Sequence, residues 1–77
     1  MRPPLDIFKK QLGLNVIKVR EMLELDVYNF SKKTNISPNT IKNIENGKVL
    51  MRGKTFLKIL FFIREKNIKL SVLLDKL

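Results

Sequence analysis

The sequence predicts an all-α fold, a compact domain of five helices with a short additional helix near the N-terminus. Three observations support this prediction. Apolar residues recur at spacings of three and four, good N-cap residues precede most of these stretches, and no run alternates apolar and polar residues as a strand would. A chain of 77 residues forms at most one domain. We therefore expect residues 1–77 to form a single unit.

The N-terminal part of the chain predicts two helices separated by a glycine. Asp6 can cap a brief helix over residues 7–12, which Gly13 is expected to end because glycine readily adopts the left-handed conformation that follows helices. Asn15 then precedes a second apolar pattern. This pattern predicts a helix over about residues 16–24.

Two short helices joined by a tight turn are predicted at about residues 26–46. Asp26 is a good N-cap for the first of them, which carries Phe30 on its apolar face. Ser37 can cap the second helix. Pro38 suits the first helical position, because the N–H that proline lacks has no partner within the helix there. This arrangement is a helix-turn-helix.

The second helix of this pair is amphipathic. Ile41 and Ile44 are three residues apart and face inward, which leaves an outer face that is polar and nearly without acid. Gly47 is expected to end the helix in a left-handed conformation, and residues 48–54 follow as a loop.

The C-terminal part predicts one long apolar helix and a final short turn. Thr55 can cap a helix over residues 56–66, and apolar side chains cover more than one side of it. A helix of this kind must be buried on more than one side. Asn67 is expected to end it, and Ser71 can cap a last turn that carries Leu73, Leu74 and Leu77.

The composition argues against an enzyme and for a polyanionic partner. The chain has no His and no Cys, so it lacks an imidazole base, a thiolate nucleophile and a zinc-thiolate site. We expect no metal and no cofactor. The longest apolar run covers residues 59–63, well short of the roughly 18 residues that span a membrane, which favours a cytoplasmic protein. A net charge of +9 favours nucleic acid as partner, and an anionic membrane surface second.

The stretch IKVREMLELDVYNFSKKTNISPNTIKNIENG, residues 17–47, resembles the phage repressor and Cro type of helix-turn-helix domain, the XRE family. The family's landmarks match in spacing without a gap. They are Arg20 in the first helix, the apolar residues Leu25, Phe30, Ile36, Ile41 and Ile44, and the closing Glu45-Asn46-Gly47. Two departures affect DNA contacts. Val27 stands where the family usually has a glutamine that holds a phosphate, and Pro38 replaces a residue that often reads a base.

This resemblance implies a sequence-specific regulator of transcription that binds double-stranded DNA, with repression by a dimer at a palindromic operator as the simplest mechanism. The side chains expected to read bases are Pro38, Asn39, Thr40 and Asn43. The side chains expected to hold phosphates are Lys32, Lys33, Lys42, Asn46, Lys48, Arg52 and Lys54. The resemblance also implies a structural ion pair between Arg20 and Glu45.

Other interpretations of the same residues remain open. Phe61 and Phe62 favour a homodimer interface, although both could belong to the core. The polar face of the second helix could simply be solvated, and any single lysine could serve solubility alone. An antitoxin-like module that binds another protein and only weakly binds DNA is the main alternative function, and a charge-driven membrane-surface binder is another. No small-molecule ligand is expected.

Overall fold

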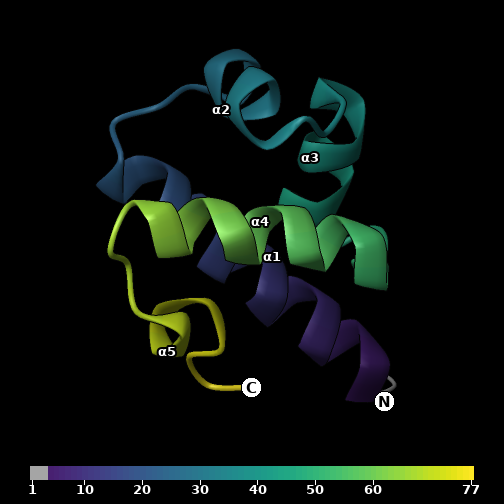
Figure 1. The fold of residues 1–77 in the computed structure, drawn as a ribbon. Helices are drawn as coiled ribbons and strands as arrows, with labels where there is room; N and C mark the ends of the chain where they lie inside the picture. The colour runs from purple at the N-terminus through teal and green to yellow at the C-terminus, as the bar shows by residue number, and fades with distance from the viewer. Residues whose placement is uncertain (1–3) are drawn as a thin grey trace.

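The computed structural model describes residues 4–77, which form five helices (Figure 1). They are α1 (Pro4–Met22), α2 (Val27–Thr34), α3 (Pro38–Glu45), α4 (Gly53–Glu65) and α5 (Leu70–Leu73). These residues contain no strand, so the predicted all-α fold is confirmed. None of the helices they form is both long enough and apolar enough to cross a membrane. Met1, Arg2 and Pro3, which the predicted domain includes, lie outside the described residues.

The N-terminal region forms one continuous helix of 19 residues, α1. The predicted separate helix over residues 7–12 and the predicted stop at Gly13 are therefore wrong. Gly13 is buried within α1, where a Cβ atom would overlap the carbonyl oxygen of Ile44 and lie 2.8 Å from that of Glu45. The missing side chain lets α1 lie directly against the end of α3. Glycine here permits a close approach and does not end a helix.

The helix pair α2 and α3 forms as the capping residues predict. The carboxylate of Asp26 accepts a hydrogen bond of 2.7 Å from the backbone N–H of Asn29. Ser37 Oγ accepts one of 3.2 Å from the N–H of Thr40, and Pro38 begins α3. Asn35 adopts a left-handed conformation with φ of 58° and turns the chain between the helices. The predicted caps are therefore confirmed.

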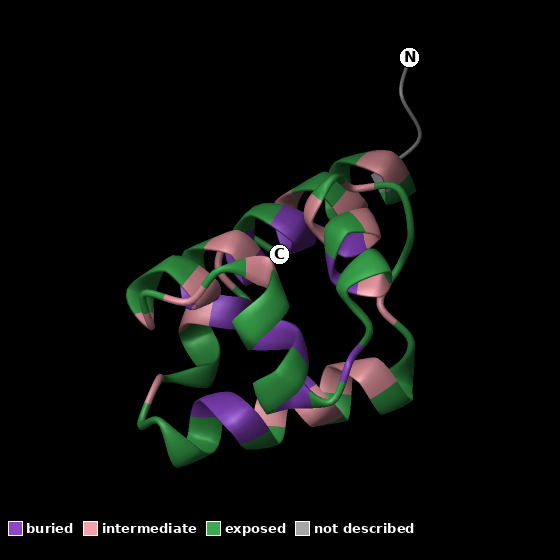
Figure 2. Cartoon of the chain, turned by 90° about the horizontal axis from the view of Figure 1, so that it is seen from above, coloured by how far each residue is buried: buried purple, intermediate pink, exposed green. Residues whose placement is uncertain are grey.

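The core lies where the inward faces of the helices meet (Figure 2). Phe30 of α2 packs edge-to-face on Phe62 of α4, with ring centroids 5.8 Å apart. Such a pair adds about 1 kcal/mol to the gain from burying the rings. The fully buried aliphatic side chains around it are Val16, Val19, Ile41, Ile44, Ile59, Ile63 and Leu73. They come from α1, α3, α4 and α5, so the core joins both halves of the chain.

The starts of α4 and α5 differ from the prediction. α4 begins at Gly53 with Arg52 at its N-cap, and α5 begins at Leu70 with Lys69 at its N-cap. The predicted caps at Thr55 and Ser71 are therefore wrong. Met51 packs against the core just before α4. This contact places the chain beside the core at residue 51, so the helix can begin at Gly53, two residues before Thr55.

Asn15 fastens the C-terminal segment to α1. The sequence pattern places Asn15 ahead of a helix, but the residue is buried in the middle of α1. Its Nδ2 donates hydrogen bonds of 2.8 Å to the carbonyl oxygens of Leu73 and Asp75. Its Oδ1 accepts one of 2.9 Å from Gln11. A buried amide with these three bonds is satisfied and holds α5 in place.

We expect Gly13→Ala to destabilise the domain, although alanine normally stabilises a helix by about 1 kcal/mol relative to glycine. The added methyl would press against two backbone carbonyls that cannot rotate away, at a cost of about 1–3 kcal/mol. Thermal unfolding followed by circular dichroism measures this change.

Gly53→Ala is the matched control. In the part of the chain that the structure describes, no heavy atom lies within 4 Å of a Cβ built on Gly53. We expect its melting temperature to equal or exceed that of the parent protein. Equal melting temperatures for Gly13→Ala and the parent would contradict the close approach of α1 and α3.

Candidate nucleic-acid interface

The outer face of α3 is polar and open to solvent. Pro38, Asn39, Lys42 and Asn46 are all exposed. The opposite face carries Ile41 and Ile44, which are buried in the core. α3 therefore lies on the surface with its polar side facing outward, as the sequence pattern predicts.

Two of the predicted base-reading residues lie at the edge of this face. Thr40 and Asn43 are half-buried, one helical turn apart. The hydroxyl of Thr40 is within 2.8 Å of Ser37 Oγ, in a hydrogen bond that either oxygen can donate. Thr40 therefore contributes to the N-terminal cap of α3 as well as to the surface.

A hollow of about 480 Å³ lies beside this edge of α3. Thr40 and Asn43 line one side of it. Residues 49–52, which connect α3 to α4, and Thr55 of α4 also line it. The structure therefore brings Arg52, a predicted phosphate-binding residue, to the same hollow as two predicted base-reading residues.

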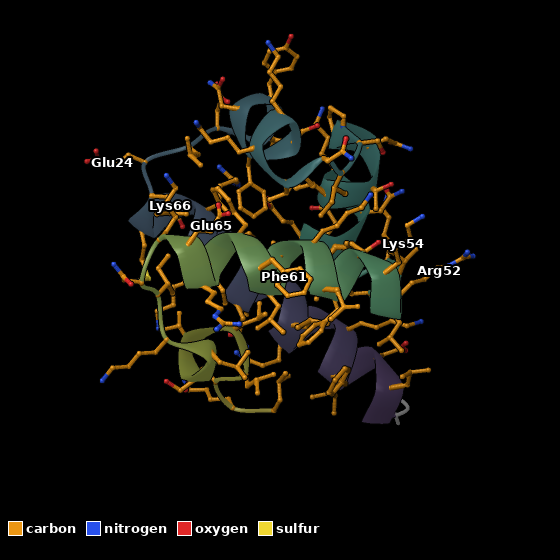
Figure 3. The ribbon with its side chains drawn as sticks, viewed as in Figure 1. Glu24, Arg52, Lys54, Phe61, Glu65 and Lys66 are labelled. Carbon is orange, nitrogen blue, oxygen red and sulfur yellow. The ribbon has the colours of Figure 1, made fainter. Side chains whose placement is uncertain are left out.

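Exposed cations gather at the end of α4 that adjoins α3. Lys48, Arg52 and Lys54 are all exposed. Figure 3 shows Arg52 and Lys54 at the N-terminal end of α4, on the side where α3 lies, while Glu24 and Glu65 lie near the opposite end. Arg52 and Lys54 therefore lie at the end of α4 next to the polar face of α3, while Glu65 at the other end lies beside Lys66.

The two lysines predicted on α2 are exposed as well. Lys33 is open to solvent, and the ammonium group of Lys32 lies over the ring of Tyr28, 4.5 Å from its centroid. This cation–π contact, worth about 0.5–1 kcal/mol at an exposed site, favours one position of the Lys32 side chain.

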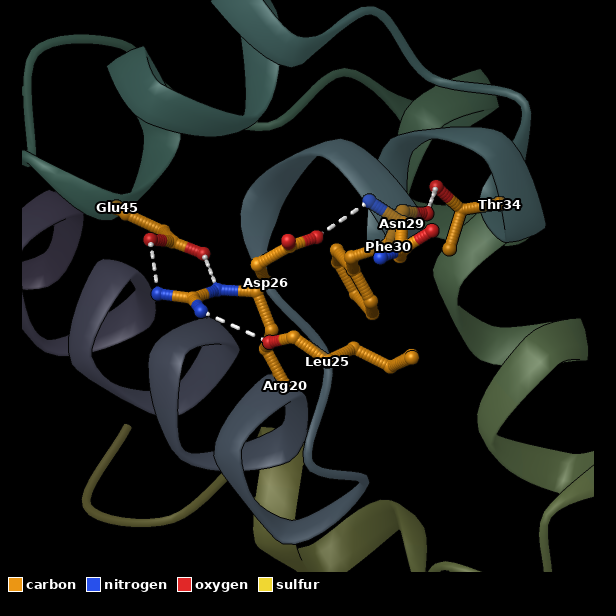
Figure 4. Close-up of polar contacts among 7 residues, drawn as sticks. All are labelled: Arg20, Leu25, Asp26, Asn29, Phe30, Thr34 and Glu45. Atoms are coloured by element: carbon orange, nitrogen blue, oxygen red, sulfur yellow. Dashed lines mark hydrogen bonds and ion pairs between the residues drawn. The ribbon is translucent and has the colours of Figure 1, made fainter.

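Both acidic side chains within residues 26–54 make interactions inside the domain. Asp26 caps α2 through its hydrogen bond to Asn29 (Figure 4). Glu45 pairs with Arg20 across the contact between α3 and α1. The six basic side chains of this segment therefore face solvent without an opposing carboxylate from the outer face of α3.

The ion pair predicted between Arg20 and Glu45 is present and has two parallel hydrogen bonds. Arg20 Nε lies 2.8 Å from Glu45 Oε2, and Nη2 lies 3.1 Å from Oε1 (Figure 4). Arg20 Nη1 also donates to the carbonyl oxygen of Leu25, at 3.0 Å. The side chains are 18% and 8% exposed, so the pair is largely shielded from water.

The hydrogen bond to Glu45 raises the pKa of Arg20 above its ordinary value, and the charge of Glu45 adds to this effect. A raised pKa favours the charged form of Arg20 in the folded state. Its contribution to stability is therefore fully present at neutral pH and is lost as the pH rises through the raised pKa of Arg20, in strongly alkaline solution.

Lys58 supports the turn between α2 and α3, a role that the sequence pattern did not reveal. Its Nζ lies 2.9 Å from the carbonyl oxygen of Asn35. Val49, Leu50 and Thr55, which line the hollow, were also missed. The sequence signal for Val49 and Leu50 was that they are two adjacent apolar residues within a basic loop, where polar residues are usual.

The predicted dimer residues Phe61 and Phe62 lie in different surroundings. Phe62 is buried against Phe30, so its predicted place in a dimer interface is wrong. Phe61 is 58% exposed and points away from the core on the outer side of α4 (Figure 3). Adjacent residues of one helix diverge by about 100°, so with Phe62 turned into the core, Phe61 faces solvent.

Comparison of the chain with models of protein families, with curated proteins and with solved structures finds no match. The resemblance to the XRE family therefore rests on the landmarks within residues 17–47, and it stays a prediction.

We expect Glu45→Ala to lower the free energy of unfolding by about 3 kcal/mol, because it leaves the largely shielded Arg20 without its carboxylate. For a domain of this size the melting temperature should fall by about 12–24 °C. Glu65→Ala, which removes an exposed carboxylate at the far end of α4, should change it by a few degrees at most. Similar melting temperatures for the two variants would show that the pair contributes little.

Proposed function

We propose that this protein is a sequence-specific regulator of transcription that binds double-stranded DNA through α3. The observation that carries the proposal is the outer face of α3, which is polar, exposed and without acid, and which lies beside an exposed cationic segment. The resemblance of residues 17–47 to the phage repressor and Cro type supports the same function.

In this proposal α3 enters the major groove. An α-helix with its side chains is about 10–12 Å across, which matches the roughly 12 Å width of that groove. Asn39 and Asn43 carry amides that can bind adenine through two hydrogen bonds. Thr40 can contact a base edge or a methyl group, and Pro38 lies at the edge of the groove.

The basic residues around α3 would bind the phosphate backbone. Lys42 and Asn46 flank the base-reading residues, Lys48, Arg52 and Lys54 follow α3, and Lys32 and Lys33 extend the positive surface over α2. These contacts give affinity and set the orientation on the duplex, while the bases give specificity.

We propose that two copies bind a palindromic operator, with α4 at their interface. Phe61 is exposed, and Leu57, one turn earlier on α4, is 49% exposed. A small domain buries a smaller share of its surface on folding than a large one, so it gains stability by covering such residues. The two copies of α3 would then lie about one helical turn of DNA apart, and an operator so occupied is closed to polymerase.

A protein-interaction module of the antitoxin type is the second candidate. The exposed apolar residues at the N-terminal end of α1, Leu5, Ile7 and Phe8, favour it, because contiguous exposed apolar surface often marks a binding site for another protein. Co-purification of an unrelated protein in fixed stoichiometry would support this function, and it would predict weak DNA binding.

Selection from a pool of random duplexes should enrich one sequence with two-fold symmetry. Asn39→Ala and Asn43→Ala should each weaken binding to that sequence by about ten-fold or more, since a two-hydrogen-bond contact is worth about 1–3 kcal/mol. Ser71→Ala, an exposed change on α5, should bind like the parent protein. Failure to enrich any sequence would reject specific recognition.

The salt dependence of binding to the selected duplex should report the phosphate contacts. Each contact contributes about 0.9 to the slope of log affinity against log salt concentration. We expect Lys48→Ala and Arg52→Ala each to reduce the slope by about 1.8, because each change removes one contact from both bound copies. Lys69→Ala before α5 should leave the slope unchanged. Equal slopes for all three variants would show that Lys48 and Arg52 do not contact phosphates.

Sedimentation at micromolar concentration should detect a dimer of about twice the 9.0 kDa chain mass. Phe61→Ser should shift the protein toward the monomer, whereas Leu14→Ser, an equally exposed apolar position on α1, should not. A parent protein that sediments as a monomer would contradict the α4 interface, and the DNA-binding proposal would then stand on α3 alone.

A further inference from the structure

Two apolar residues are exposed within the cationic segment that follows α3. Val49 and Leu50 are 40% and 43% exposed, between the exposed cations Lys48 and Arg52. The next residue, Met51, packs against the core. Met51 therefore holds the segment against the core. Val49 and Leu50 are not needed for this attachment and remain exposed to solvent.

Val49 and Leu50 also line the hollow beside α3, together with Thr40, Asn43 and Arg52. An apolar wall thus meets an amide, a hydroxyl and a guanidinium group, and Arg52 is the group there that can bind a phosphate. Phosphate oxygens would lose hydration against such a wall without gaining a hydrogen bond from it, which disfavours the DNA backbone as the group in contact with Val49 and Leu50.

A pyrimidine C5-methyl group is the apolar feature that base edges display in the major groove. We propose that Val49 and Leu50 form a seat for such a methyl group, on the base that pairs with the one read by Asn43. This inference rests on the proposed function and narrows the duplex that the protein recognises.

Thymine and 5-methylcytosine both carry this methyl group. Asn43 favours thymine, because an amide binds adenine with two hydrogen bonds and adenine pairs with thymine. The structure therefore assigns to the operator an A·T base pair in each half-site at the position that faces the hollow.

Replacement of single thymines by deoxyuridine in the selected duplex tests this proposal, because it removes the methyl group and keeps base pairing. At one position per half-site we expect binding to weaken about four-fold, which corresponds to about 0.8 kcal/mol for one buried methyl. At the other thymines the affinity should stay unchanged.

The double variant Val49→Ala, Leu50→Ala should bind the thymine and deoxyuridine duplexes equally well. Leu57→Ala, an equally exposed apolar change on α4, should keep the four-fold difference. Since Val49 and Leu50 lie outside the core, we expect the double variant to fold, and circular dichroism verifies this.

The outcomes separate this proposal from the proposed function. Enrichment of a sequence that binds its thymine and deoxyuridine forms equally would overturn the methyl seat and leave DNA recognition intact. Enrichment of a sequence without thymine near the hollow would overturn the assignment of thymine. In that case, tighter binding after C5-methylation of a cytosine there would identify 5-methylcytosine as the occupant.

Discussion

The contact between α1 and α3 sets the direction in which α3 presents its polar face. An isolated helix of eight residues is not stable in water, so α3 depends on its neighbours. Gly13 lets the backbone of α1 approach the carbonyl oxygens of Ile44 and Glu45, and Arg20 binds the carboxylate of Glu45. The first contact sets the distance between the helices, and the second sets their register. Both act on the last turn of α3, while Ser37 caps its first turn.

This arrangement also shapes the electric field outside the domain. The acids within residues 26–54, Asp26 and Glu45, make internal contacts, so neither lies on the outer face of α3. Interactions between exposed charges are largely screened beyond about 8 Å at physiological salt. The total of +9 therefore matters less than the few cations beside α3, such as Arg52 and Lys54. Because the carboxylate of Glu45 is paired with Arg20 inside the domain, it does not offset the positive charge on the outer face of α3.

Features that depend on a few neighbouring residues could be predicted from the sequence, and features that depend on packing between distant segments could not. Asp26 and Ser37 cap helices because each side chain bonds a backbone N–H three residues later. Gly13 looks like a helix terminator, and its contact lies more than thirty residues away in sequence, at Glu45. The burial of Phe62 likewise depends on Phe30 of α2. At the candidate site, the polar face of α3 was predictable from the helical spacing of Ile41 and Ile44. The hollow was not, because it depends on the path of residues 49–52 after the helix.

The hydrogen bond between Thr40 and Ser37 distinguishes Thr40 from the two asparagines of α3 as a partner for a base. Thr40 Oγ1 already bonds to Ser37 Oγ, at the cap of the helix. A base that displaced Ser37 Oγ from this hydroxyl would remove one hydrogen bond near the cap, so its net gain from that exchange would be small. Asn39 and Asn43 carry amides with no such role in capping, and their full hydrogen-bonding capacity is available to a base. Discrimination by hydrogen bonds should therefore fall mainly to the two asparagines, with Thr40 acting through its shape at the edge of the hollow.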